Sequence, residues 1–261
     1  MIHTVYLRVP ASRLAAALMD AERPWCLPGL PLGRAERTGE NSARLSAGGS
    51  EALISWMDAD GGRCCRMAVR HEPKTTVFRG QTPDASWGEA WALLSVRLKS
   101  FLEGVALIDV PELGAPQDTE VTLTAHFDAP PERIWSALTD PGELDAWIAD
   151  GAQVDLSPGG VYDYNWTHDG PAHVLRIDAP RTLETDWRFG AVAAEGRVTW
   201  TVGPEDGGAR ITLVHHGFGF KRSDWPREGY VWGWADFLQA LALYLAGAGP
   251  SDSWRGAAAA I

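Results

Sequence analysis

The amino-acid sequence predicts an α+β protein of two domains, each a curved antiparallel sheet around a long C-terminal helix, with two short helices after the first strand. Three observations support this fold class. The chain has 261 residues, which is enough for two domains of ordinary size. Its two halves share short sequence matches in the same order. Each half also ends in an apolar segment with helical periodicity.

The internal repeat defines the expected domain boundaries. We expect a shortened domain over 1–104, a linker over 105–118, a second domain over 119–247 and a flexible tail over 248–261. The linker is rich in turn-forming residues, and the net charge changes close to residue 115. The matching pieces of the two halves are 10–20 with 130–140, Gly48-Gly49 with Gly159-Gly160, 73–75 with 180–182, and 87–90 with 232–235.

The second half predicts the elements of one domain in order. An alternating, β-branched strand over 119–127 precedes two short helices, the first beginning at Pro131 and the second ending at Trp147. Ser223 or Asp224 then caps the long helix, whose apolar positions recur with a period of 3.6 residues. Between these helices, turn residues delimit six predicted strands, which are 153–156, 161–168, 172–177, 182–188, 196–202 and 209–216.

The first half follows the same plan with fewer residues. The stretch from Trp25 to Trp87 is 23 residues shorter than the stretch from Trp147 to Trp232. This difference corresponds to one hairpin with a loop, at roughly 5–6 residues per strand. We therefore expect a smaller sheet, a long helix over about 83–103, and a cavity that is open on one side.

The run 129–141 resembles the opening of the activator-of-Hsp90-ATPase-homologue type of domain, in the START/Bet v1-like (SRPBCC) superfamily. The resemblance covers 119–247, and the first half shares it chiefly through the repeat. It implies a helix-grip fold with an internal pocket. The superfamily binds lipids, sterols and polyketides, and some members cyclise or aromatise polyketides. Further pieces that carry the resemblance are Trp147, 158–160, 178–181, Trp187, 210–218 and 233–234.

The resemblance does not extend to co-chaperone activity. The eukaryotic activators have a separate Hsp90-binding domain, whose place is taken here by another unit of the same kind, so Hsp90 is not expected as a partner.

Strand alternation places many aromatic side chains on one inward face. The chain has 13 tryptophans. As a set these rings exceed what one helix can cover, which favours a hydrophobic cavity, although for each ring simple core packing stays the alternative. Further inward positions are Leu183, Thr185, Val198, Ile211 and Leu213. The candidate ligand-binding residues are Tyr162, Tyr164, Trp166, His168, Trp187, Trp200, His215, Tyr230, Trp234, Phe237, Trp87 and Trp91.

The sequence contains little that indicates catalysis. His215 is the one weak candidate for a catalytic base, and the three cysteines have no metal-binding spacing, so we expect neither a metal nor a cofactor. The leading hypothesis is binding of a hydrophobic metabolite that is lipid-like or polyketide- or polyene-like, within a bacterial polyketide or enediyne pathway. The ligand would occupy an internal cavity of one domain or one cavity that spans both domains. Two alternatives stay open: a polyketide cyclase or aromatase that uses a cavity His or Tyr, and a self-resistance protein that sequesters a toxic product.

Charge limits the remaining partners. The net charge is −11, all of it in residues 116–261, because 1–115 carry 13 basic and 13 acidic side chains. Such an anion repels phosphate backbones, so nucleic acid is not expected as a partner, and no apolar run is long enough for membrane insertion. The chain shows no leader segment, which predicts a cytoplasmic protein. The oligomeric state stays open, and a monomer is compatible with the sequence.

Overall fold

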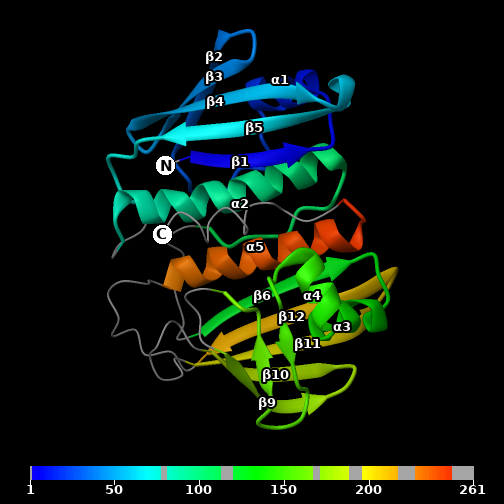
Figure 1. Cartoon of the computed structure of the whole chain (residues 1–261). Helices are drawn as coiled ribbons and strands as arrows, with labels where there is room; N and C mark the ends of the chain where they lie inside the picture. The colour runs from blue at the N-terminus through cyan, green and yellow to red at the C-terminus, as the bar shows by residue number, and fades with distance from the viewer. Residues whose placement is uncertain are drawn as a thin grey trace. The chain divides into compact units, whose positions relative to one another are not determined.

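The computed structural model describes residues 2–77, 81–112, 120–166, 171–187, 196–216 and 227–248 (Figure 1). The described residues fall into two compact units. One unit contains 2–112 together with 227–239, and the other contains 120–216 together with 240–248. The last helix thus contributes to both units. The domain boundaries expected from the repeat stay predictions.

The first unit contains a five-stranded antiparallel sheet in the order β1-β5-β4-β3-β2. Buried and exposed residues alternate along its strands, so one face is covered and the other is open. Helix α2 packs against β1 and runs alongside the strands (Figure 1). The elements are β1 (Ile2–Leu7), α1 (Ala11–Met19), β2 (Leu32–Gly39), β3 (Ser42–Ala47), β4 (Ser50–Ala59), the 3-10 turn η1 (Asp60–Gly62), β5 (Cys64–His71) and α2 (Pro83–Glu103).

The second unit contains a seven-stranded antiparallel sheet in the order β6-β12-β11-β10-β9-β8-β7. As in the first unit, the first strand pairs with the last strand of the meander. Helix α3 packs over β11 and β12. The elements are β6 (Glu120–Phe127), α3 (Pro131–Thr139), α4 (Pro141–Trp147), β7 (Gln153–Val154), β8 (Val161–Asp163), β9 (Ala172–Asp178), β10 (Thr182–Trp187), β11 (Gly196–Glu205), β12 (Gly208–His216) and α5 (Arg227–Leu245).

The α+β fold class with two helix-grip units is confirmed. The two sheets differ by two strands, as the length difference of one hairpin predicted. The expectation of two short helices in each unit is confirmed only for the second. In the first unit α1 is followed by turns, because Pro28 restricts the residue before it and Gly29 has a φ of 75°.

The predicted strand over 161–168 is too long, because β8 ends at Asp163. Asn165 has a φ of 58°, and its backbone N–H donates to the Asp163 carboxylate at 2.9 Å. Asparagine tolerates this left-handed conformation, and the Asx turn removes the segment from the sheet. Residues 168, 188, 223 and 224, on which predicted element ends fall, lie outside the described residues.

A buried arginine of α2 binds the loop around Trp25 and the segment that follows the helix. Arg97 is 5% exposed; it donates to the Trp25 carbonyl at 3.1 Å and to the Ile108 carbonyl at 2.6 Å. Burial lowers the pKa of Arg97. The side chain of Gln239 binds the segment after α2 as well. It accepts from the Ile108 N–H and donates to the Ala106 carbonyl, both at 2.9 Å. Side chains thus replace sheet partners for this backbone.

We expect Arg97→Ala to lower the free energy of unfolding by about 3 kcal/mol, because it leaves buried carbonyls without donors. Urea unfolding followed by far-UV circular dichroism measures the change. Arg63→Ala is the matched control, since exposed Arg63 also donates to one backbone carbonyl, and should change stability by less than about 0.5 kcal/mol. Equal effects of the two substitutions would contradict this role of Arg97.

Candidate functional site

The inner face of the seven-stranded sheet is built from two cross-strand rows. One row is Leu183, Trp200, Leu213 and Leu123, on neighbouring strands from β10 to β6. The second row contains Thr185, Val198, His215 and Val121. All eight side chains are buried, and so is Ile211, which confirms the predicted inward alternation. The wall that they form has no ionised side chain.

His215 is the titratable group of this wall. It is 0% exposed, and its ring lies 5.7 Å from the ring of half-buried Trp187 at an interplanar angle of 64°. Burial, helped by the neighbouring His216, lowers the pKa of His215 to about 3. The imidazole is therefore neutral at pH 7. A base with such a pKa accepts a proton poorly, so the ring is better suited to hydrogen bonding than to general base catalysis.

Three aromatic residues at the end of β8 form a second part of the site. Tyr162 packs edge-on against Tyr164 at 5.3 Å, and Tyr164 stacks on Trp166 at 4.7 Å. Their polar atoms bind within the protein: the Tyr162 hydroxyl donates to the Leu138 carbonyl at 2.6 Å, and the Trp166 indole N–H donates to the Ile148 carbonyl at 3.0 Å. Burial raises the pKa of both tyrosines. These rings therefore offer apolar surface and no acid at neutral pH.

The aromatic residues of α5 are buried as expected. Tyr230, Trp234 and Phe237 are each less than 8% exposed, and the rings of Trp234 and Phe237 lie 4.9 Å apart. This part of α5 belongs to the first unit by its contacts. His168, the remaining candidate of the second half, lies outside the described residues.

In the first unit, Trp87 and Trp91 belong to a buried polar chain that sequence reasoning missed. Trp91 donates its indole N–H to His71 Nδ1 at 3.1 Å, and His71 Nε2 lies 2.7 Å from Ser50 Oγ. Ser50 donates its hydroxyl to the Ala47 carbonyl at 2.8 Å. Trp87 packs edge-on against His71 at 4.8 Å. The available signal was the position of His71 in its strand, which has the inward parity of Val69.

The directions of these bonds assign the protons. Because Nδ1 of His71 accepts from Trp91, the neutral ring carries its proton on Nε2 and donates to Ser50. Burial lowers the pKa of His71, which favours this neutral form. Ser50 therefore cannot be activated by His71 as a nucleophile, since the histidine donates to it. The cluster is a satisfied core network.

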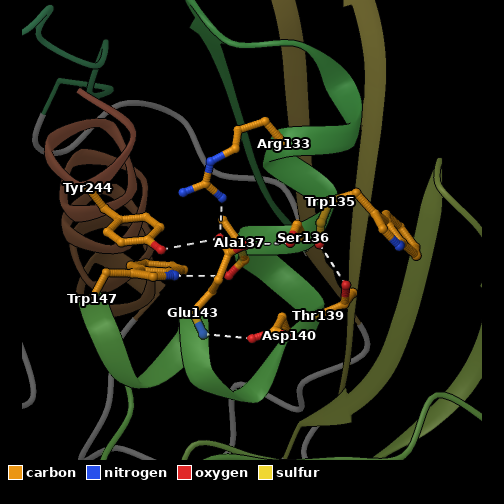
Figure 2. Close-up of polar contacts among 9 residues, drawn as sticks. All are labelled: Arg133, Trp135, Ser136, Ala137, Thr139, Asp140, Glu143, Trp147 and Tyr244. Atoms are coloured by element: carbon orange, nitrogen blue, oxygen red, sulfur yellow. Dashed lines mark hydrogen bonds and ion pairs between the residues drawn. The ribbon is translucent and has the colours of Figure 1, made fainter. Parts of the chain in front are cut away.

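A cluster of polar side chains joins α3, α4 and α5 and includes polar residues of the run 129–141 (Figure 2). This cluster, called the clasp below, consists of Arg133, Ser136, Asp140, Glu143 and Tyr244. Glu143 forms an ion pair with Arg133, accepts from the Ser136 hydroxyl at 2.5 Å and accepts from the Tyr244 hydroxyl at 3.3 Å. The Arg133 guanidinium lies 5.0 Å from the Tyr244 ring centre. Asp140 caps α4 through the Glu143 N–H at 2.9 Å. These polar groups fasten helices together.

The described residues contain no group of three or more His, Cys, Asp or Glu side chains arranged to hold a metal ion. None of their helices is both long and apolar enough to cross a membrane.

Comparison with known families gives a match in the second half of the chain. Residues 128–246 match the family model described as Activator of Hsp90 ATPase homolog 1-like protein. This part of the chain is similar to the domains of that family. The resemblance based on the run 129–141 is thereby confirmed. The matched region begins just before α3 and extends past the end of α5, so it contains the clasp and most of the seven-stranded sheet.

Several solved structures are similar to the chain. Protein MLL2253 from Mesorhizobium loti is 23% identical with a TM-score of 0.42, over 48% of this chain and 96% of its own. CalU16 from Micromonospora echinospora is 22% identical with a TM-score of 0.42, over 58% and 89%. The HSP90 activator PFC0360w from Plasmodium falciparum is 20% identical with a TM-score of 0.34, over 39% and 75%. Comparison with curated protein sequences gave no match.

We expect acid to destabilise the second unit through His215. Its folded pKa of about 3 lies below the unfolded value of about 6.5, so stability is constant above pH 6.5 and falls as the pH drops toward 3. Between pH 7 and pH 5 the loss from this group should be about 2 kcal/mol. Urea unfolding at a series of pH values measures it. His215→Gln should flatten the dependence, whereas His216→Gln, half-exposed on the other face of β12, should retain it. Retention of the full slope in His215→Gln would refute the assignment.

Proposed function

We propose that the second unit binds an uncharged, hydrophobic metabolite in an internal cavity lined by the inner face of the seven-stranded sheet. The observation that carries this proposal is the composition of the wall: two rows of mostly apolar side chains, with Thr185 and the neutral His215 as its polar groups. Ligand sites are mostly apolar with few, well-placed polar groups. An ionised ligand would lose its hydration here without gaining a counter-charge.

The ligand class follows from the shape of the aromatic groups. The stacked rings of Tyr164 and Trp166, and Trp187 beside His215, offer flat apolar surfaces. Such surfaces suit an extended unsaturated or polycyclic molecule, such as a polyketide, a polyene or a lipid. We place this binding in a bacterial natural-product pathway by resemblance to the superfamily.

The protonation states favour binding over the cyclase alternative. A cyclase that transfers protons needs a group whose pKa lies near the working pH. Burial instead lowers the pKa of His215 to about 3 and raises those of Tyr162 and Tyr164. The Tyr162 hydroxyl is also engaged with the Leu138 carbonyl. Sequestration of a toxic product would use the same cavity and is a variant of the binding proposal.

Titration with the uncharged fluorescent probe N-phenyl-1-naphthylamine tests the proposal. We expect saturable binding with quenching of tryptophan fluorescence. Val198→Phe places a ring between Thr185 and His215 on the inner face, and should weaken binding about tenfold because a filled cavity excludes the probe. Thr199→Phe adds the same ring to the opposite face of β11 and should leave affinity within about twofold.

Circular dichroism and thermal unfolding are the control that tests whether both variants are folded. His215→Gln should leave probe affinity largely unchanged, because an apolar probe needs no polar anchor. Absence of saturable binding by the wild type, or equal affinities of Val198→Phe and wild type, would disprove an internal cavity at this wall.

A further inference from the structure

The outward face of the five-stranded sheet exposes large apolar side chains. Ile2 is 62% exposed, Met57 is 60% exposed and Leu53 is 42% exposed. They are three of the five exposed large hydrophobic residues among those that the structure describes. All three point away from the covered face, since they alternate with buried neighbours in β1 and β4. Single exposed apolar residues are normal, but a group on one face marks an interaction site.

Arginines lie directly beside these apolar residues. In one cross-strand row, Leu53 is flanked by Arg44 on β3 and by Arg70 on β5, with Ile2 beyond on β1. In a second row Met57 lies opposite Arg66. Directly opposite residues have Cβ atoms only about 5 Å apart. Arg44, Arg66, Arg70, Ile2, Leu53 and Met57 are called the arginine face below.

Arg66 and Arg70 carry the uncompensated positive charge of this face. Among the described residues no ion pair involves either of them, whereas Arg44 lies opposite Glu36 on β2 and 3.5 Å from Glu51, with the Arg44 and Glu51 side chains more than half exposed. Exposed pairs of this kind contribute little.

The outward face of the seven-stranded sheet differs in this respect. There Arg197 pairs with Glu184 at 3.4 Å, and Arg210 pairs with Glu205. The imidazole of His173 lies 3.5 Å from the Asp186 carboxylate. The second sheet therefore pairs these outward charges internally, whereas the first sheet leaves Arg66 and Arg70 available to a partner.

We propose that the arginine face docks an acidic segment of a partner protein that carries apolar side chains between its carboxylates. Arginine forms bidentate hydrogen bonds with carboxylates, and the apolar residues supply the area that point charges alone lack. Arg66 and Arg70 lie four residues apart on β5, about 13 Å, which sets the spacing of the partner's carboxylates. The carboxylates would be four residues apart in an extended segment or about nine apart on a helix.

Charge favours an acidic protein segment over two other occupants of the arginine face, a second copy of the chain and an anionic membrane. A second copy that docks through the same face would place arginines against arginines. An anionic membrane would meet the arginine face, but the chain as a whole carries a net charge of −11 and is repelled by such a surface. A protein segment presents carboxylates locally and avoids this repulsion.

The probe is a synthetic acidic peptide with leucines between its glutamates, titrated into the 15N-labelled full-length protein and followed by amide chemical shifts. We expect shifts confined to β1, β3, β4 and β5. Arg66→Glu/Arg70→Glu should weaken binding at least about tenfold. Leu53→Ser/Met57→Ser should also weaken it. The charge-matched control Arg13→Glu/Arg181→Glu changes exposed arginines outside the five-stranded sheet, in α1 and just before β10, and should stay within about twofold of the wild type.

Three results would overturn the proposal. The first is affinity that is unchanged in Arg66→Glu/Arg70→Glu, and the second is equal affinity for the same peptide with glutamine at each glutamate. The third is that the face has another occupant: binding to phosphatidylglycerol vesicles without binding the peptide, or self-association in sedimentation velocity that Leu53→Ser/Met57→Ser abolishes. All variants are compared with the wild type by circular dichroism, and the substituted side chains are exposed, so the folded state should be retained.

Discussion

The pairing of the first strand with the last strand of each meander is the constraint on which both units depend. β1 pairs with β5 from Ile2↔Arg70 to Leu7↔Cys65, and β6 pairs with β12 along its whole length. The first and second strands of each unit lie at opposite edges of its sheet, so the segment between them, which contains α1 or α3 and α4, must cross from one edge to the other. The long helix that follows the last strand then has one apolar sheet face to cover. The inner rows of the seven-stranded sheet exist because this register aligns β6, β12, β11 and β10.

Satisfaction of buried polar atoms by the protein itself determines what the interior can do. The Tyr162 hydroxyl, the Trp166 indole and the Trp91 indole each donate to another group of the protein. Polar groups that are already hydrogen-bonded need no partner from a ligand, so the surface that these side chains offer to a ligand is mostly aromatic carbon. Burial also disfavours charge, which keeps His215 and His71 neutral. An interior of this kind holds an uncharged molecule more readily than it moves protons.

Periodicity and the repeat predicted most of the fold, because strand parity and segment length are local properties of the chain. The inward positions of β10 to β12 follow from alternation alone, and the missing hairpin follows from counting residues between corresponding tryptophans. Local backbone exceptions were not predicted: the left-handed Asn165 ends β8 early, and Pro28 with Gly29 replaces a helix. The chain from Trp91 through His71 to Ser50 and the carbonyls around Arg97 join residues distant in sequence, so no spacing rule identifies them.

The repeat also shows where the two copies have diverged. In the match of 87–90 with 232–235, Glu89 stands where the second half has Trp234. Glu89 accepts from the Gln81 amide at 2.8 Å, and burial raises its pKa to about 7. Glu89, His71 and Arg97 make the interior of the first unit polar, and each of them is hydrogen-bonded to another group of the protein. The inner rows of the second sheet are apolar apart from the neutral Thr185 and His215. An interior lined by such hydrogen-bonded polar side chains offers little apolar surface to a hydrophobic ligand. The first unit is therefore better suited to recognition through its exposed arginine face, and the second to recognition through its inner wall.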